Sequence, residues 1–247
     1  MQKHSLQFNY KVITVYIAAF IGLIAVQIGI TVFFDIESLS EVNQATFGAA
    51  MNLVLYGFLT IVFFFIAKIY LFKNQWLYFK EKPVFSFFMV GFGMYLIFAV
   101  LFLIGAIYEV TGGPSTPRNQ DLINNILTSA WYNGFMVFVF AVLFAPIVEE
   151  MVFRKAIFGI IFSKFGAAVA ILGNSLIFAM IHVTGEFSAW IGGTISFWDF
   201  GLITLPYISM SIIISFIYFY SGKLIWVAIT VHMLVNLISV SSGLLGL

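Results

Sequence analysis

The chain has 247 residues, of which 62% are apolar, 19% are aromatic and only 9% are charged. A soluble domain carries about 25% charged residues, so this composition excludes a water-soluble fold and indicates a polytopic membrane protein. The formal charge of +1 argues against nucleic acid as a partner. The absence of cysteine excludes disulfides, thiol nucleophiles and thiolate metal sites.

Several apolar stretches are long enough to cross the membrane, since a helix needs about 20 residues to span about 30 Å of hydrocarbon. A backbone in lipid must satisfy its own hydrogen bonds, so we predict an all-α fold, a polytopic membrane bundle of seven transmembrane helices. The predicted spans are 12–34, 47–72, 84–108, 131–162, 166–184, 202–221 and 224–243. The fourth is too long for one crossing, and Pro146 interrupts it, so an alternative with eight helices stays open.

No stretch is long and polar enough to form a separate soluble domain, so we predict a single membrane-embedded domain over residues 1–247. Within it, residues 1–108 contain three plain N-terminal spans, and residues 131–243 form a helical core that contains the polar motifs. The loop 109–130 joins the two parts. Its segment 111–117 reads Thr-Gly-Gly-Pro-Ser-Thr-Pro, which is typical of a turn-rich linker.

The charged residues outside the motifs indicate the topology. If seven spans alternate, every lysine and arginine except Arg118 falls on one side of the membrane. The acidic residues of the opposite side are Asp35, Glu37, Glu41, Glu109, Asp121, Glu186 and Asp199. The positive-inside rule then predicts a multi-pass protein of the cell membrane with a cytoplasmic N-terminus and an external C-terminus. Eight helices would need a re-entrant or interfacial segment to keep this asymmetry.

Ionisable residues within spans are costly and usually functional. The first three spans offer almost none, and we interpret the amides of Gln27 and Asn52 there as contacts between helices. Three polar clusters lie instead on three separate spans of the C-terminal half. They are Glu149-Glu150-x-x-x-Arg154, Phe178-x-x-x-His182 and His232-x-x-x-Asn236.

The two adjacent glutamates are expected to serve different partners. Neighbours in a helix point about 100° apart, and Glu150 has Arg154 four residues later on its own face. Glu149 has no basic residue at that spacing, which leaves it as the carboxylate suited to general-base chemistry. A salt bridge that only fixes the depth of the helix at the membrane border is the alternative for Glu150 and Arg154.

The histidines extend this site hypothesis. Phe178 and His182 share one helical face, and His232 and Asn236 share another and can project towards one point. A lone histidine in a span is more often structural, but two histidines that can both meet a carboxylate favour a functional site. Two histidines and one glutamate can also hold zinc, so Glu149, His182 and His232 would be the ligands if a metal were present.

Together the three clusters resemble the signature motifs of the CAAX protease and bacteriocin-processing (CPBP, or Abi) family. The run from Glu149 to Gly159 is similar to members from Gram-positive bacteria. The resemblance covers roughly the C-terminal half and implies an intramembrane glutamic endopeptidase without a cofactor. It implies that Glu149 activates water with the help of His182. It further implies that His232 and Asn236 form an oxyanion hole. Arg154 would hold Glu150 in place, and Phe178 flanks the second motif.

The resemblance also implies the partners. The substrate would be a small membrane-associated, leader-bearing or lipidated peptide in peptide maturation, quorum sensing or bacteriocin processing, with membrane lipid around it. Two alternatives stay open: a non-proteolytic family member that acts as a scaffold or as a regulator of a sensor kinase, and a small proton-coupled transporter. The sequence shows no internal repeat in favour of the transporter. It leaves the oligomeric state open.

Overall fold

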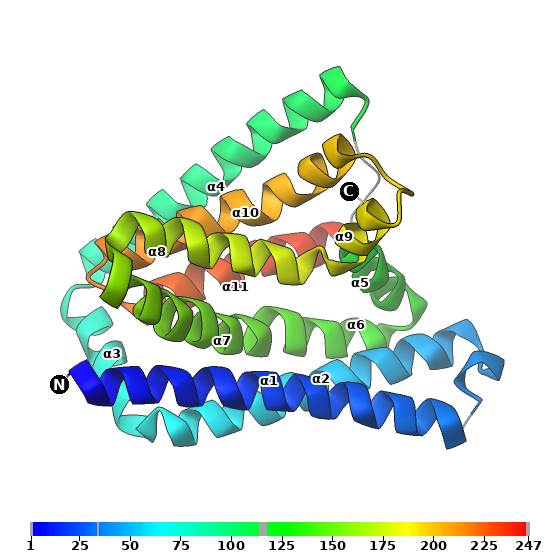
Figure 1. Cartoon of the computed structure of the whole chain (residues 1–247), viewed down its shortest axis with the longest axis horizontal. Helices are drawn as coiled ribbons and strands as arrows, with labels where there is room; N and C mark the ends of the chain where they lie inside the picture. The colour runs from blue at the N-terminus through cyan, green and yellow to red at the C-terminus, as the bar shows by residue number, and fades with distance from the viewer. Residues whose placement is uncertain (1, 34, 114–117, 246–247) are drawn as a thin grey trace. The chain divides into compact units, whose positions relative to one another are not determined.

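A computed structural model describes residues 2–33, 35–113 and 118–245. Helices form nearly all of this part of the chain, and it contains no strand, which confirms the predicted all-α class (Figure 1). The helices are α1 (Gln2–Phe33), η1 (Ile36–Ser38), α2 (Glu41–Ile66), α3 (Lys68–Glu81), α4 (Pro83–Thr111), α5 (Arg118–Ser129), α6 (Trp131–Val137), η2 (Phe138–Phe144), α7 (Ala145–Glu150), η3 (Met151–Ile157), α8 (Phe158–His182), α9 (Thr184–Ile191), α10 (Phe197–Tyr220) and α11 (Ile225–Leu245). Here η1 is a 3₁₀ turn, and η2 and η3 are π-helices.

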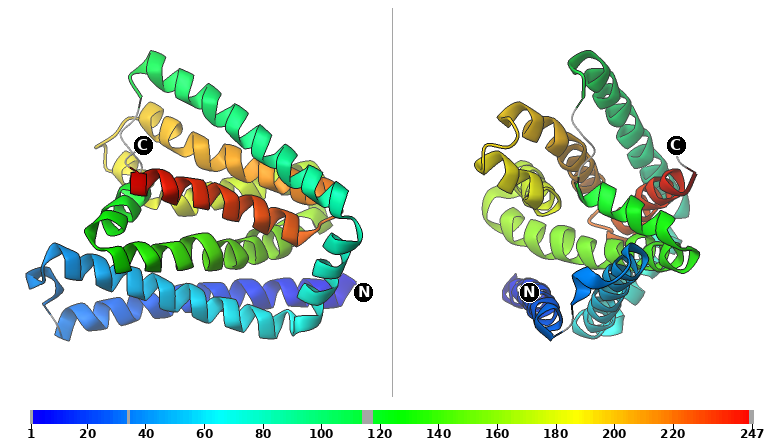
Figure 2. Two further views of the ribbon diagram at one scale, coloured as in Figure 1. Left: turned by 180° about the vertical axis from the view of Figure 1, so that it is seen from behind. Right: turned by 90° about the vertical axis from the view of Figure 1, so that its right-hand side faces the viewer.

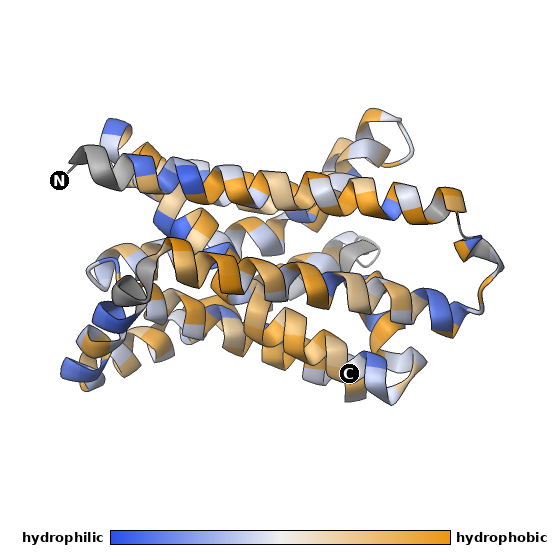
Figure 3. Ribbon diagram, turned by 90° about the horizontal axis from the view of Figure 1, so that it is seen from below, coloured by the Kyte–Doolittle hydropathy of each residue, from blue (hydrophilic) through white to orange (hydrophobic). Residues whose placement is uncertain are grey.

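Six stretches of the described chain are long and apolar enough to cross a membrane, and hydrophobic residues dominate these long helices (Figure 3). The chain is therefore a multi-pass membrane protein. The fourth stretch, Trp131–His182, covers both the fourth and the fifth predicted span. Gly166 interrupts it with φ 79° and ψ −176°, a conformation that is essentially restricted to glycine. With this break counted, the predicted number of seven is approximately right.

The helix is not broken at Pro146, where the alternative with eight helices would divide it. Elements α6, η2, α7 and η3 follow one another without a gap (Figure 2). A proline inside a helix has no N–H to donate and crowds the preceding turn. The backbone adopts the wider π turns of η2 before Pro146 and of η3 after it, a usual way to accommodate such a disturbance.

Three helices were not predicted as such. Helix α2 ends at Ile66 although the apolar stretch was predicted to run to residue 72, and α3 begins at Lys68, the cation within that stretch. Helix α9 follows α8 after a single residue. Helix α5 lies within the predicted loop 109–130. Of the predicted linker 111–117, residues 114–117 lie outside the described residues.

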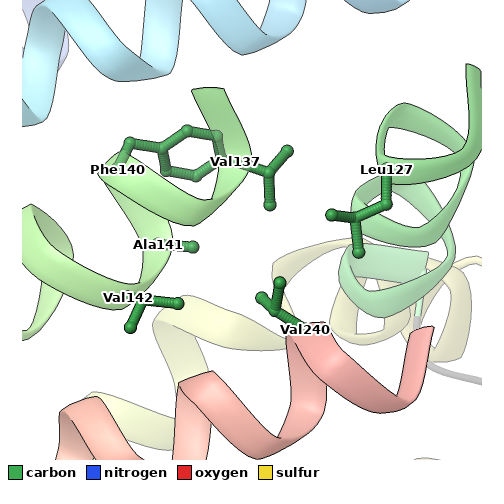
Figure 4. Close-up of a cluster of buried hydrophobic side chains, with 6 residues drawn as sticks. All are labelled: Leu127, Val137, Phe140, Ala141, Val142 and Val240. Atoms are coloured by element: carbon green, nitrogen blue, oxygen red, sulfur yellow. The ribbon is translucent and has the colours of Figure 1, made fainter. Parts of the chain in front are cut away.

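The chain forms two compact units, and each of them combines segments from both predicted parts of the domain. The first unit consists of Met1–Asn74, Ile123–Ile157 and His232–Leu247. In it, α1 packs against α2 and η3, and α2 packs against α6, η2 and α7. A small hydrophobic core joins α5, α6, η2 and α11 (Figure 4); its buried residues are Leu127, Val137, Phe140, Ala141, Val142 and Val240.

The second unit consists of Gln75–Leu122 and Phe158–Val231. Its centre is α10, which packs against α8, α4 and α9. Buried polar groups join α8 to α10, since the Asn174 amide donates to Ser215 Oγ at 3.0 Å and Ser175 Oγ lies 3.4 Å from the same oxygen. Such side-chain contacts hold helices together in lipid, where apolar burial offers little preference for one helix partner over another.

The turn between α10 and α11 depends on two residues with positive φ, Gly222 at 80° and Lys223 at 63°. The ammonium group of Lys223 lies over the ring of Phe162, 3.5 Å from its centroid. Burial lowers the pKa of Lys223, because the charged form loses water there. The turn is thus held by a cation–π contact as well as by its backbone.

Candidate active site

The two glutamates close the short helix α7, between the π-helices η2 and η3. Both carboxylates are buried: Glu149 is 6% exposed and Glu150 is fully buried. A charge without water needs a partner of opposite charge or several hydrogen bonds. The partners of the two carboxylates therefore decide what each can do.

Glu150 forms the ion pair that its spacing predicted. The Nε atom of Arg154 lies 3.1 Å from Glu150 Oε2, and both side chains are fully buried. The pair is therefore not an exposed bridge at the membrane border. A buried pair of this kind is costly to break, because the remaining charge is left without compensation.

His232 of α11 lies between the two carboxylates. Its Nδ1 is 2.8 Å from Glu150 Oε1, and its Nε2 is 3.7 Å from Glu149 Oε2. An ionised carboxylate only accepts hydrogen bonds, so Nδ1 carries a hydrogen and donates to Glu150. Two carboxylates and the Arg154 guanidinium carry one negative charge in excess.

Tyr56 of α2 completes the surroundings of Glu149, and sequence analysis missed it. Its hydroxyl donates to Glu149 Oε1 at 3.2 Å. The first three spans were expected to offer almost no ionisable residues, and this tyrosine was not counted among the candidates. A phenol in an aromatic-rich apolar span gave no signal, because the partner lies 93 residues away in the chain.

Asn236 contacts a different group from His232, although both lie on one face of α11. Its Nδ2 donates to the carbonyl oxygen of Ala141 at 2.8 Å. In the π-helical turn the N–H of Ala145 donates to Phe140, five residues earlier. The next donor in that pattern would be Pro146, which has no N–H, so Asn236 supplies the bond that the carbonyl of Ala141 lacks.

The second unit holds His182, near the end of α8. Its Nδ1 lies 2.8 Å from the carbonyl oxygen of Phe178, and its ring stacks between Phe178 and Tyr207, at 4.3 and 5.3 Å between centroids. A carbonyl only accepts, so Nδ1 carries a hydrogen and donates it to Phe178. Sequence analysis did not identify Tyr207, which α10 provides.

The predicted site residues are thus distributed over both units. The first unit brings together Glu149, Glu150, Arg154 and His232, with Asn236 one helical turn further along α11. Phe178 and His182 are in contact in the second unit.

Residues 131–238 match a family model, described as type II CAAX prenyl endopeptidase, Rce1-like. All three motifs lie within the matched segment. This match identifies residues 131–238 as a domain of the CAAX protease type. It indicates a membrane protease. No curated protein and no solved structure matches the chain.

The zinc alternative would need Glu149, His182 and His232 as ligands. Within the described ranges, no three His, Asp or Glu side chains are grouped so that they could hold a metal ion. Glu149 and His232 would supply two ligands in the first unit, whereas a catalytic zinc takes three from the protein. We therefore derive no step that involves a metal.

Proposed function

We propose that the chain is an intramembrane endopeptidase that hydrolyses a peptide bond in a small membrane-associated, leader-bearing or lipidated peptide, with Glu149 as the general base. One observation carries the proposal. Glu149 is a buried carboxylate that accepts a hydrogen bond from the Tyr56 hydroxyl and lies 3.7 Å from an imidazole nitrogen of His232, within the segment that matches the protease family.

The reaction needs a base and a donor for the developing oxyanion. Glu149 takes a proton from a water molecule while the oxygen of that water forms a bond to the peptide carbonyl carbon. The carbon–nitrogen bond then breaks, and the proton passes to the leaving amine. The motif resemblance supports His182 as the residue that assists this base.

The same resemblance supports His232 and Asn236 as donors to the oxyanion. The Nδ2 group of Asn236 has two hydrogens, and its bond to Ala141 uses one of them. A dry interior strengthens such donors, because no water competes for the developing charge. Glu150, which is paired with Arg154, holds the His232 ring from its Nδ1 side.

Several features support a lipid-associated substrate. The matched family model is described as a type II CAAX prenyl endopeptidase, and the run from Glu149 to Gly159 resembles Gram-positive members. The positive-inside rule supports a protein of the cell membrane with a cytoplasmic N-terminus, and we place the cut near the cytoplasmic face. The motif resemblance supports quorum-sensing and bacteriocin-related peptides as substrates. No cofactor is part of this proposal.

The proposal is tested with purified protein in liposomes and two fluorogenic probes: an S-farnesylated peptide that ends in a CAAX sequence, and an amphipathic leader peptide. Glu149→Gln should lower the rate at least about 100-fold, as expected when a general base is removed, and His182→Ala should also abolish cleavage. The matched control is Glu109→Gln, the same change at an exposed acid, which should cleave normally.

Two results would contradict the proposal. The first is wild-type protein that cleaves neither probe. The second is a Glu149→Gln variant that cleaves as fast as wild type. A non-proteolytic scaffold or regulator predicts the first result, because it makes no use of the carboxylate as a base.

A further inference from the structure

Helices outside the matched segment contribute to the surroundings of Glu149. Aromatic rings of α1 and α2 form a continuous series with rings of η2 and η3, all within the first unit. The distances between ring centroids are 6.5 Å for Phe153 and Tyr16, 4.6 Å for Tyr16 and Phe20, 6.3 Å for Phe20 and Tyr56, and 6.3 Å for Tyr56 and Phe140. The ring of Tyr56 is therefore held by aromatic neighbours from both α1 and η2.

The position of this ring fixes the position of its hydroxyl. The hydroxyl donates to Oε1 of Glu149 at 3.2 Å, while Oε2 of the same carboxylate faces Nε2 of His232 at 3.7 Å. The two oxygens thus have different partners. A carboxylate that ends a flexible side chain has a broad torsion at its last bond, and a donor on one oxygen restricts that torsion.

We propose that Tyr56 is a positioning residue, whose hydroxyl orients the Glu149 carboxylate so that Oε2 is the oxygen that takes the proton. This inference rests on the proposed function of Glu149 as the base. It assigns a part of the reaction to α2, which lies outside residues 131–238.

Packing alone does not explain a tyrosine at this position. Phenylalanine would fill the same place between Phe20 and Phe140 without a hydroxyl. A hydroxyl in an apolar interior is unfavourable unless it is bonded, and the bond of Tyr56 is to the carboxylate. The hydroxyl is thus the part of the side chain that needs a function.

Tyr56→Phe removes the hydroxyl and keeps the ring. With the farnesylated CAAX probe, we expect kcat to fall about 10- to 100-fold, the value of a hydrogen bond to a charged group. KM should stay unchanged, because the hydroxyl contacts the base and not the peptide. Tyr108→Phe is the matched control: it removes a hydroxyl that donates to the carbonyl oxygen of Leu202 at 2.7 Å in the second unit, and kcat should not change.

An unchanged kcat in Tyr56→Phe would overturn the proposal, and so would a rise in KM at constant kcat, which would mean that the hydroxyl binds substrate. These results are separable from failure of the proposed function. If Glu149→Gln is inactive while Tyr56→Phe is normal, only the role of Tyr56 is wrong. If Glu149→Gln is active, the base itself is wrong.

A second measurement does not depend on cleavage. Tyr56→Phe should lower the Tm of the wild-type protein, but not that of a Glu149→Leu variant, in which the hydroxyl has already lost its acceptor. The effect of Tyr108→Phe should be the same in both backgrounds. Equal effects of Tyr56→Phe in the two backgrounds would show that the hydroxyl and the carboxylate are not coupled, and would overturn the proposal.

Discussion

Replacing Arg154 with methionine should destabilise the protein markedly, because it breaks a buried ion pair. The guanidinium is fully buried, 3.1 Å from the equally buried carboxylate of Glu150. Methionine retains much of the side-chain volume, so the change tests the charge and not a cavity. It leaves Glu150 with His232, whose Nδ1 lies 2.8 Å away, as its remaining described contact.

The expected loss is about 3–5 kcal/mol, the usual effect of removing one partner from a buried ion pair. For a chain of this length each kcal/mol corresponds to about 2–4 °C, so the Tm should fall by roughly 6–20 °C. Neutralising both partners should recover most of the loss, because a well-packed neutral pair leaves no uncompensated charge.

Thermal unfolding in detergent and the amount of protein in membranes both measure this effect. The comparison includes Arg154→Met, the double variant Glu150→Gln with Arg154→Met, and Lys164→Met as a control that removes an exposed cation. The control should stay within about 0.5 kcal/mol of wild type. If Arg154→Met unfolds at the wild-type temperature, or the double variant is less stable than the single one, the buried pair does not have the role we assign to it.

Two further predictions concern the backbone and the chemistry. Gly166→Ala should lower the free energy of unfolding by about 1–3 kcal/mol, because a residue with a side chain is strained at φ 79° and ψ −176° even though space is free around it. The control Gly105→Ala, also in free space but inside α4, should be neutral or stabilising. Equal Tm values for the two variants would contradict the argument. Cleavage of the farnesylated probe should survive strong chelation, because the proposed reaction has a carboxylate as its base; loss of activity on chelation that zinc restores would refute this.

The sequence predicted the long helices well, because their apolar runs are set by membrane thickness alone. It failed where helices are short and depend on packing. Helix α5 has apolar residues at helical spacing, namely Leu122, Ile123, Ile126 and Leu127. The criterion of membrane-spanning length nevertheless predicts a loop there, because the helix is too short to cross the membrane. Its Leu127 is buried in a core with Val240 of α11, a contact that no local pattern shows.

For the site too, local contacts could be predicted from the sequence and distant contacts could not. The pairing of Glu150 with Arg154 follows from a spacing of four residues within one helical run. The bond from His232 to Glu150 and the bond from Tyr56 to Glu149 join residues 82 and 93 positions apart. Motif resemblance indicated the importance of His232 but not its contact, and Tyr56 lies on α2, where no motif was recognised.

The distant contacts, not the local one, make the two adjacent carboxylates different. Glu150 is fixed by a guanidinium, which does not give up its proton, and by the Nδ1 side of His232. Glu149 accepts a hydrogen bond from the Tyr56 hydroxyl and faces Nε2 of the same histidine ring at 3.7 Å. The surroundings of the proposed base thus depend on α2 and α11 as much as on α7.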